Sequence, residues 1–484
     1  MSEIISQFKK KIIDADIAIM GLGISNMALI RFLHRCGVKK ITIYDKMAGE
    51  NIEKNVKILA DENIYCDCVT GEDYLNTLAK SQHNYIFKSP VIRPDLPQIK
   101  LAVENGAVLT SEMELFFDLC PCKIFGVTGS DGKTTTTTLI HRLLSAHCEN
   151  TSSKVWLGGN IGNPLINAID EIKEDDYAVV ELSSFQLMTM KKSPDVAVIT
   201  NITPNHLDVH KDYEEYIMAK ENIFNNQNEN GIVVLNAKNE KTAEAAKRCI
   251  NLSKKVRLFS AHMDSEESFD SHAEGVAYRK NGRLVWKSSY YIYNIDESEM
   301  RVPGIFNKEN LLAAVSACAG IINDEDIIKT LREFTGVRHR IEFVRELEGV
   351  KYYNSSIDSS PNRTINTLSV FDKNVVMIAG GKDKNIPYDD IGSVICEKVK
   401  ALILIGPTAE KIEKAVKARP EFNPEKIKFF YPENYAEAVE CARKASKSGD
   451  CVVLSPASTS FDRFKNFEER GEAFCKLVKG EWNF

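Results

Sequence analysis

Short apolar runs alternate with helical stretches along the first hundred residues. Residues 17–20 and 41–44 are apolar enough for buried strands, and a helix is expected to begin near Asn26 between them. Strands that alternate with helices in this way are typical of a doubly wound α/β fold. We therefore predict a Rossmann-like N-terminal domain over residues 1–111.

The same alternation resumes in two further blocks. Strands are expected at 123–127, 177–181 and 196–201. Edge strands are expected in the 260–300 region, which is acidic and then aromatic, with alternation around 290–293. Helices are expected at 213–224 and 310–322, and strands of a third block at 375–378, 401–405 and 451–454. We predict a central domain with a mainly parallel sheet over residues 112–336, and a Rossmann-like C-terminal domain over residues 337–484.

Composition agrees with three α/β domains of ordinary globular type. The chain has 484 residues, of which 43% are hydrophobic and 27% charged. A net charge of −6 disfavours nucleic acid and acidic membranes as partners. No apolar run approaches the roughly 18 residues of a membrane span, and residues 1–11 do not resemble a signal peptide. We expect a cytoplasmic protein whose 12 cysteines are reduced thiols.

The most informative segment is a glycine loop that follows the strand at 123–127. Residues 126–135 read Gly-Val-Thr-Gly-Ser-Asp-Gly-Lys-Thr-Thr and lead into a helix, so backbone N–H groups and the positive helix end converge on phosphates. Lys133 adds a mobile positive charge, and Thr134 offers its hydroxyl to Mg²⁺. A plain glycine turn is the alternative. The residues expected to bind ATP here are Gly129, Ser130, Asp131, Gly132, Lys133, Thr134 and Thr135.

The loop departs from the usual phosphate-loop spacing, because residue 127 is valine and not glycine. Its pattern Thr-Gly-x-x-Gly-Lys-Thr-Thr resembles the loop of the Mur ligases and of their relatives, the folyl-polyglutamate synthases. Asn160 in Gly-Gly-Asn-Ile-Gly, Glu181 at a strand end and His206 in Asn-His-Leu-Asp-x-His are similar to motifs of that family's central domain. The resemblance implies that Glu181 and His206 hold Mg²⁺ together with Thr134; taken singly, His206 reads as an ordinary loop histidine.

Lys220 lies in a Tyr-x-x-x-Lys frame on the helix expected at 213–224. By itself it reads as a solvated lysine. The resemblance implies that it is carbamylated and supports a second Mg²⁺, so that Lys133, His206 and Lys220 are the expected catalytic residues. It also implies that Asn307 and Arg340 contact ATP, although Asn307 is equally suited to cap a helix.

The N-terminal domain carries Gly21-Leu22-Gly23, with Asp45 at the end of its second strand. This arrangement is compatible with NAD binding, but Asn26 stands where the third glycine of that fingerprint is expected. The resemblance implies instead that this domain binds the UDP part of a substrate. The residues expected there are Ser25, Asp45 and Ser89, with Asn160 from the central domain.

Residues 454–471 closely resemble the signature of the branch of Mur ligases that adds D-glutamate. The resemblance implies that D-glutamate is bound by Ser359, Lys384, Ser460 and Phe467. One segment departs from that branch, which often carries Asn-Asp-Ser-Lys-Ala-Thr-Asn. This chain has Ser355 in place of the aspartate and Ile357 in place of the lysine.

The resemblance as a whole implies an ATP-dependent ligase, active as a monomer, with Mg²⁺ as its metal. It would join D-glutamate to UDP-N-acetylmuramoyl-L-alanine through an acyl phosphate, in the synthesis of peptidoglycan precursors. Two alternatives stay open from the sequence. One is a relative that adds another amino acid, and the other is a nucleotide-binding regulator without ligase chemistry, which the changes at Ser355 and Ile357 bring into consideration.

Overall fold

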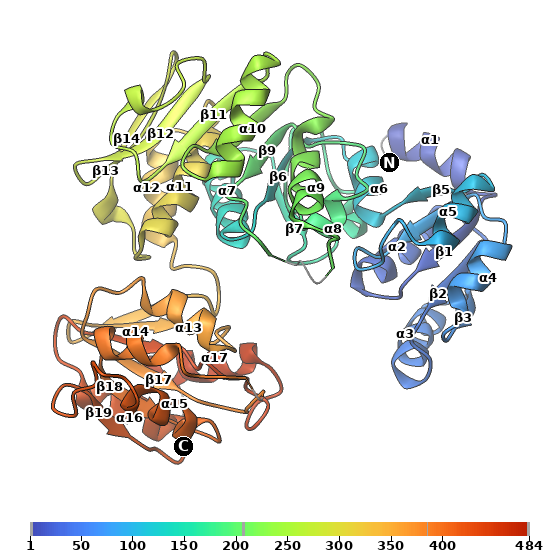
Figure 1. Cartoon of the computed structure of the whole chain (residues 1–484). Helices are drawn as coiled ribbons and strands as arrows, with labels where there is room; N and C mark the ends of the chain where they lie inside the picture. Colours follow the sequence, from blue (N-terminus) through green and yellow to red (C-terminus); the bar gives the residue numbers. More distant parts are fainter. Residues whose placement is uncertain (1–2, 206–208, 385, 482–484) are drawn as a thin grey trace. The chain divides into compact units, whose positions relative to one another are not determined.

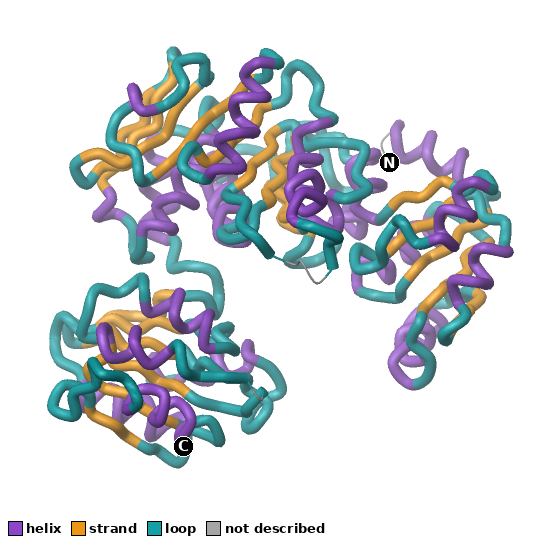
Figure 2. Tube along the Cα trace, viewed as in Figure 1, coloured by secondary structure: helices purple, strands orange, loops and turns teal. Residues whose placement is uncertain are grey.

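The computed structural model describes residues 3–205, 209–384 and 386–481 (Figure 1). The chain forms two compact units. One comprises Met1–Asp296 with Glu309–Ile327, and the other comprises Glu297–Lys308 with Ile328–Phe484. Three sheets are flanked by helices (Figure 2), which confirms the predicted α/β class.

The N-terminal sheet is parallel throughout, with strand order β3-β2-β1-β4-β5. Because the order reverses between β1 and β4, the loops after these two strands flank a crevice where ligands of such sheets bind. The strands are β1 (Asp16–Met20), β2 (Lys40–Asp45), β3 (Asp67–Thr70), β4 (Tyr85–Lys88) and β5 (Val108–Thr110). The helices are α1 (Glu3–Ile12), α2 (Ile24–Arg35), α3 (Glu50–Asp61), α4 (Tyr74–Lys80), α5 (Pro97–Glu104) and α6 (Glu112–Leu119).

The central sheet has the strand order β14-β13-β12-β11-β10-β9-β6-β8-β7. It is parallel from β7 to β12 and antiparallel in the hairpins β12–β13 and β13–β14, which form one edge as expected. The strands are β6 (Lys123–Thr128), β7 (Val155–Gly159), β8 (Tyr177–Glu181), β9 (Val196–Ile199), β10 (Ile232–Asn236), β11 (Lys255–Ser260), β12 (Gly275–Lys280), β13 (Arg283–Ser288) and β14 (Ile292–Asp296). The helices are α7 (Lys133–Cys148), α8 (Ser184–Leu187), α9 (Tyr213–Asn225), α10 (Glu240–Asn251), α11 (Ile305–Cys318) and α12 (Asp324–Glu333), with a 3₁₀ turn η1 at Leu165–Ala168.

Several boundaries differ from the sequence prediction by a few residues, and local contacts explain two of these differences. The edge strand β14 begins at Ile292, because Tyr290 and Tyr291 form a turn whose amides both donate to Ser288 Oγ. Helix α11 begins at Ile305 and ends at Cys318, earlier than predicted at both ends. The chain then turns through Gly320 at φ 87°, a left-handed conformation that favours glycine.

The C-terminal sheet has the order β15-β16-β20-β17-β18-β19, and only β15–β16 is antiparallel. Apolar clusters cover both faces, so the strands read as continuous hydrophobic runs. The strands are β15 (Glu342–Leu347), β16 (Val350–Asn354), β17 (Val375–Ala379), β18 (Val399–Leu404), β19 (Lys428–Phe430) and β20 (Cys451–Leu454). The helices are α13 (Pro361–Leu368), α14 (Ile391–Lys398), α15 (Ala409–Lys417), α16 (Tyr435–Ala445) and α17 (Phe467–Lys479).

One apolar core joins the N-terminal and central sheets. Helix α6 connects them and packs on η1, and it carries the buried Glu112, whose Oε1 has no hydrogen-bond partner. Burial raises the pKa of Glu112 to about 8, so this carboxyl is held protonated near neutral pH. An ionised carboxylate at this position would be costly.

We expect Glu112→Gln to stabilise the protein increasingly as the pH rises from 6 to 9. The pKa of Glu112 is about 8 in the folded chain and lies near 4.3 when unfolded. The stability that the protonated carboxyl contributes is therefore fully present below pH ~4 and is lost as the pH rises through 8. Glutamine does not titrate. Thermal unfolding should show the variant gaining at least about 3 °C over the parent across this range. The exposed Glu104→Gln is the control, and a pH-independent difference for Glu112→Gln would contradict the assignment.

Candidate functional site

The loop between β6 and α7 is held tightly against the end of β9. A side chain at Gly129, where φ is 152°, would lie 1.9 Å from Thr200 Oγ1, and one at Gly132 would lie 2.3 Å from Asn310 Oδ1. The amides of Ser130 and Asp131 donate to the carbonyl and side-chain oxygens of Asn201, at 2.9 Å each. Both glycines are therefore required by close approach, and the loop is fixed from two directions.

Lys133, at the start of α7, folds back over this loop. Its Nζ lies 2.9 Å from the carbonyl oxygens of Gly129 and Ser130. A positive charge is thus held above a helix N-terminus, where unpaired N–H groups also attract anions. Together with the buried Thr135, the residues from Gly129 onward form one continuous loop that leads into α7, which we call the phosphate-binding loop after the role that the sequence predicts for it.

Glu181, at the end of β8, faces this loop and the end of β7. Its Oε2 accepts a hydrogen bond from Thr134 Oγ1 at 2.7 Å, and its Oε1 accepts one from Asn160 Nδ2 at 3.0 Å. Such hydroxyl and carboxylate oxygens are the ligands that Mg²⁺ prefers. Among the described residues, no three His, Cys, Asp or Glu side chains gather as a metal site. The predicted ligand His206 lies outside the described residues.

Lys220 reaches the same loop from α9. It is fully buried, its Nζ donates to Gly129 O at 2.7 Å, and it lies 4.6 Å from the ring centroid of Tyr216. Burial, helped by the nearby charge of Lys133, lowers the pKa of Lys220 to about 6. The amine is therefore mostly neutral at pH 7, which is the reactive form of a lysine.

In the N-terminal domain, the loops after β1, β2 and β4 meet at the crevice. Asp45 Oδ2 accepts a hydrogen bond from the amide of Leu22 at 2.8 Å. Ser89 packs against Gly21 so closely that a Cβ added to Gly21 would lie 3.0 Å from the Cβ of Ser89. Asn26 stands where the dinucleotide fingerprint has its third glycine. Its side chain donates to Met20 O and Gly21 O and so holds this loop in place. Ser25 lies on the first turn of α2 beside this loop.

In the C-terminal unit, the loops after β17 and β20 pair with each other. Thr459 Oγ1 donates to Lys382 O at 3.0 Å, and a Cβ at Gly381 would be 2.2 Å from Thr459 O. The exposed Lys384 lies two residues after Lys382 in the sequence, and the buried Ser460 directly follows Thr459. Phe467, at the start of α17, accepts a hydrogen bond from Ser356 Oγ through its carbonyl oxygen at 2.7 Å.

The remaining predicted residues belong to the same unit. Asn307 lies within α11 and is not its cap, and its Nδ2 donates to Pro303 O. Arg340 closes a turn by donating its amide to Val337 O at 2.9 Å. Ser359, in the loop between β16 and α13, donates its amide to Ile357 O at 2.8 Å.

Comparison with known proteins supplies the family. The chain matches the Mur ligase middle domain over residues 127–318 and the glutamate ligase domain of Mur ligases over residues 339–458. It is 48% identical to the UDP-N-acetylmuramoylalanine--D-glutamate ligase of Ruminiclostridium cellulolyticum, over 99% of both chains. It is 46% identical to the enzyme of the same name from Acetivibrio thermocellus, also over 99% of both. The chain belongs to the Mur ligase family.

Solved structures of Mur ligases share the fold. The MurF ligase of Thermotoga maritima superimposes with a TM-score of 0.52 at 16% identity, over the full length of both chains. MurF from Acinetobacter baumannii gives a TM-score of 0.55 at 16% identity, covering 83% of this chain and 92% of the other.

Sequence reasoning missed the residue that holds the amino-acid signature of this Mur ligase in place. Arg470 has no exposed surface, and its guanidinium donates to Ser356 Oγ at 2.9 Å, Ser356 O at 2.8 Å and Ser458 O at 3.0 Å. It thereby ties the loop after β16 to the loop after β20. A buried charge is costly unless it is hydrogen-bonded, so these loops are held by several strong bonds. Its position within residues 454–471, which resemble the signature, was the available signal.

Asp358 was missed as well. It stands where the family motif has alanine, three positions after Ser355, where the motif has aspartate. Its buried carboxyl accepts a hydrogen bond from Ser455 Oγ at 2.7 Å, with Ser355 and Thr367 as further hydroxyl partners. Burial raises the pKa of Asp358 to about 6. The carboxyl group that the motif leads one to expect at 355 is therefore present nearby, on residue 358.

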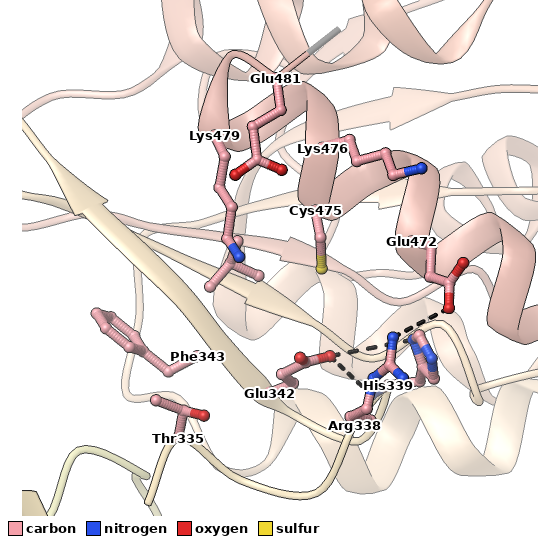
Figure 3. A pocket seen from close by; sticks show the side chains of 11 residues that line it. Thr335, Arg338, His339, Glu342, Phe343, Glu472, Cys475, Lys476, Lys479 and Glu481 are labelled. Carbon is pink, nitrogen blue, oxygen red and sulfur yellow. Dashed lines mark hydrogen bonds and ion pairs between the residues drawn. The ribbon is translucent and has the colours of Figure 1, made fainter. Parts of the chain in front are cut away.

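A cavity in the C-terminal unit lies between β15 and α17 (Figure 3). Two of its lining side chains, Arg338 and Glu472, form an ion pair at 3.0 Å near His339. Both acidic and basic side chains line the cavity. The lining residues are Thr335, Arg338, His339, Glu342, Phe343, Val344, Glu472, Cys475, Lys476, Lys479 and Glu481.

We expect Ser355→Asp to destabilise this Mur ligase by about 2 kcal/mol, because a second carboxyl would be buried beside Asp358. The double variant Ser355→Asp/Asp358→Ala moves the carboxyl to the motif position and should recover most of that loss. Urea unfolding of both variants and of Asp358→Ala measures this. Additive effects of the two substitutions would show that their side chains do not share one site.

Proposed function

We propose that this Mur ligase uses ATP to join D-glutamate to UDP-N-acetylmuramoyl-L-alanine in the synthesis of peptidoglycan precursors. The observation that carries the proposal is the identity of 42–48% along 97–99% of the chain to relatives that all bear the name of this activity. The phosphate-binding loop supplies the ATP-dependent half of that chemistry.

An amide does not form from a carboxylate and an ammonium group in water without activation. ATP first converts the alanyl carboxylate to an acyl phosphate, and the amine of D-glutamate then displaces phosphate. Negative charge develops on the transferred phosphoryl group, so fixed N–H donors and a cation aimed at it accelerate the step. The amides in the first turn of α7 and the amine of Lys133 support this role.

The oxygen set around Glu181 fits Mg²⁺, and we assign Thr134, Glu181, His206 and carbamylated Lys220 as the residues that hold two such ions. When bound there, Mg²⁺ would supply positive charge that offsets the charge of the phosphate oxygens. Asn160 then orients the Glu181 carboxylate through its 3.0 Å hydrogen bond. A carbamylated Lys220 would replace a buried amine with an anion at the same place, beside Lys133.

The three domains divide the ligands between them in this proposal. Residues 1–111 bind the UDP moiety through Ser25, Asp45 and Ser89, assisted by Asn160. Residues 112–336 bind ATP. Asn307 contacts the nucleotide, together with Arg340 from residues 337–484. Residues 337–484 bind D-glutamate, whose two carboxylates require cations and hydroxyl or N–H donors. The proposed D-glutamate residues are Ser359, Lys384, Ser460 and Phe467.

We further propose a cytoplasmic monomer. All 12 cysteines are free thiols, including Cys120 and Cys122, whose sulfur atoms are only 3.5 Å apart, which fits a reducing compartment. Within the described part of the chain, no helix is both long and apolar enough to cross a membrane.

Phosphate release tests the proposed function. Release that requires ATP, UDP-N-acetylmuramoyl-L-alanine and D-glutamate together, with a product heavier by one glutamyl residue, is expected. Lys133→Ala should lower turnover at least about 100-fold while the melting temperature stays within a few degrees, because transition-state charge loses its cation. Release independent of both cosubstrates, or equal activity in Lys133→Ala, would overturn the proposal. Another amino acid as the preferred substrate would instead indicate a different branch.

We expect Lys220 to become carbamylated at neutral pH, since its pKa of about 6 leaves the amine neutral and able to attack CO₂. Incubation with ¹³C-labelled bicarbonate at pH 8 should give a carbamate ¹³C signal that is absent in Lys220→Arg. The signal should weaken below pH ~6, where the amine is protonated. Lys211→Arg, which alters an exposed lysine near the same helix, should keep it; an unchanged signal in Lys220→Arg would refute the modification.

A further inference from the structure

A single arginine connects the proposed UDP-substrate loop to the central domain. Arg93 lies four positions after Ser89, in the loop that follows β4. Its Nη1 and Nη2 donate to the two carboxylate oxygens of Glu215 at 3.0 and 2.8 Å. Its Nε and Nη2 donate to Asp95 at 2.8 and 3.1 Å, and Nη1 also donates to Val209 O at 2.7 Å. Every nitrogen of the guanidinium therefore has an oxygen partner.

This contact is stronger than an ordinary surface ion pair. The side chains of Arg93 and Glu215 are only 22% and 24% exposed, and the pairing is bidentate. Planar fork geometry of this kind is specific to arginine, which a lysine cannot reproduce. Lys211 adds a second cation, with its Nζ 2.7 Å from Asp95 and its amide donating to Glu215 at 2.9 Å.

Glu215 lies in the first turn of α9, and the same helix contacts the phosphate-binding loop (Figure 1). Tyr216 OH is 2.9 Å from Ser130 Oγ, and Lys220 Nζ is 2.7 Å from Gly129 O. His210 fills the space beside Glu215, with Nδ1 at 3.4 Å from its carboxylate and an edge contact to the Tyr216 ring at 5.2 Å. The N-terminus and the side of one helix are thus tied to two different loops.

We propose that Arg93 is a positioning residue that couples occupancy of the UDP-substrate pocket to the geometry of the phosphate-binding loop, through Glu215 and helix α9. A substrate that orders the Ser89 loop fixes Arg93, Arg93 fixes the start of α9, and α9 sets Tyr216 and Lys220 against Ser130 and Gly129. The inference rests on the proposed function, because it assumes that the Ser89 loop binds the UDP substrate and that the loop at Gly129 binds ATP.

The test measures coupling between the two ligands. The Kd of adenylyl imidodiphosphate is determined with and without saturating UDP-N-acetylmuramoyl-L-alanine. The full-length wild type should show a change of at least about fivefold. In Arg93→Ala, Arg93→Lys and Glu215→Gln the change should fall to within about twofold. The double variant Arg93→Ala/Glu215→Gln should lose no more of the coupling than either single variant. In these variants kcat should fall while the KM for D-glutamate stays the same.

Arg35→Ala is the matched control. Arg35 also joins the N-terminal and central parts of the first unit, through Asn167 O at 3.4 Å and Asp170 at 3.5 Å, but contacts neither ligand loop. It should keep the coupling of the wild type. Equal loss in Arg35→Ala, full coupling in Arg93→Lys and Glu215→Gln, or a wild type without coupling would overturn the inference. These results are separable from failure of the proposed function, in which the wild type would form no glutamyl product.

Discussion

The central constraint of this site is that one carbonyl oxygen, that of Gly129, accepts hydrogen bonds from two lysines. Lys133 reaches it at 2.9 Å and Lys220 at 2.7 Å, so two amines lie within a few ångströms of each other. Two ammonium groups at such a distance in a buried setting repel strongly. Burial above all, helped by the nearby charge of Lys133, lowers the pKa of Lys220 to about 6. The loop could not bring both lysines this close if residue 129 carried a side chain.

Much of the fold follows from local pattern. The strands β8 and β20 coincide with the apolar runs at 177–181 and 451–454, because fully buried parallel strands are written as continuous hydrophobic segments. The loop between β6 and α7 also lies where the sequence predicts it, since its glycines, lysine and threonines are contiguous. The predicted bounds of helix α11 were wrong because the start of this helix depends on the turn at Gly304, where φ is 98°, and not on apolar periodicity.

Contacts between distant segments could not be read from the chain. Arg470 lies in the quoted signature, yet nothing in its neighbours announces that its charge is buried against Ser356 and Ser458. The pairing of Arg93 with Glu215 joins positions 122 residues apart, and each residue alone looks like a surface charge. The role of Asp358 depends on hydroxyl groups from the loop after β20 and from α13, which only the fold brings to it. The sequence therefore predicts which side chains carry the chemistry, but it does not reveal the distant contacts that hold them in place.

The close contact between Gly132 and Asn310 has a consequence for biosynthesis. The phosphate-binding loop emerges from the ribosome early, but the hydrogen bond from Thr136 Oγ1 to Asn310 Oδ1 joins residues 174 positions apart. Asn201, which orders the loop from the other direction, is likewise made much later than the loop. A nascent chain that ends within the central sheet thus carries the complete loop sequence without the partners that shape it. The loop can have all the contacts described here only once α11 has been translated and packed.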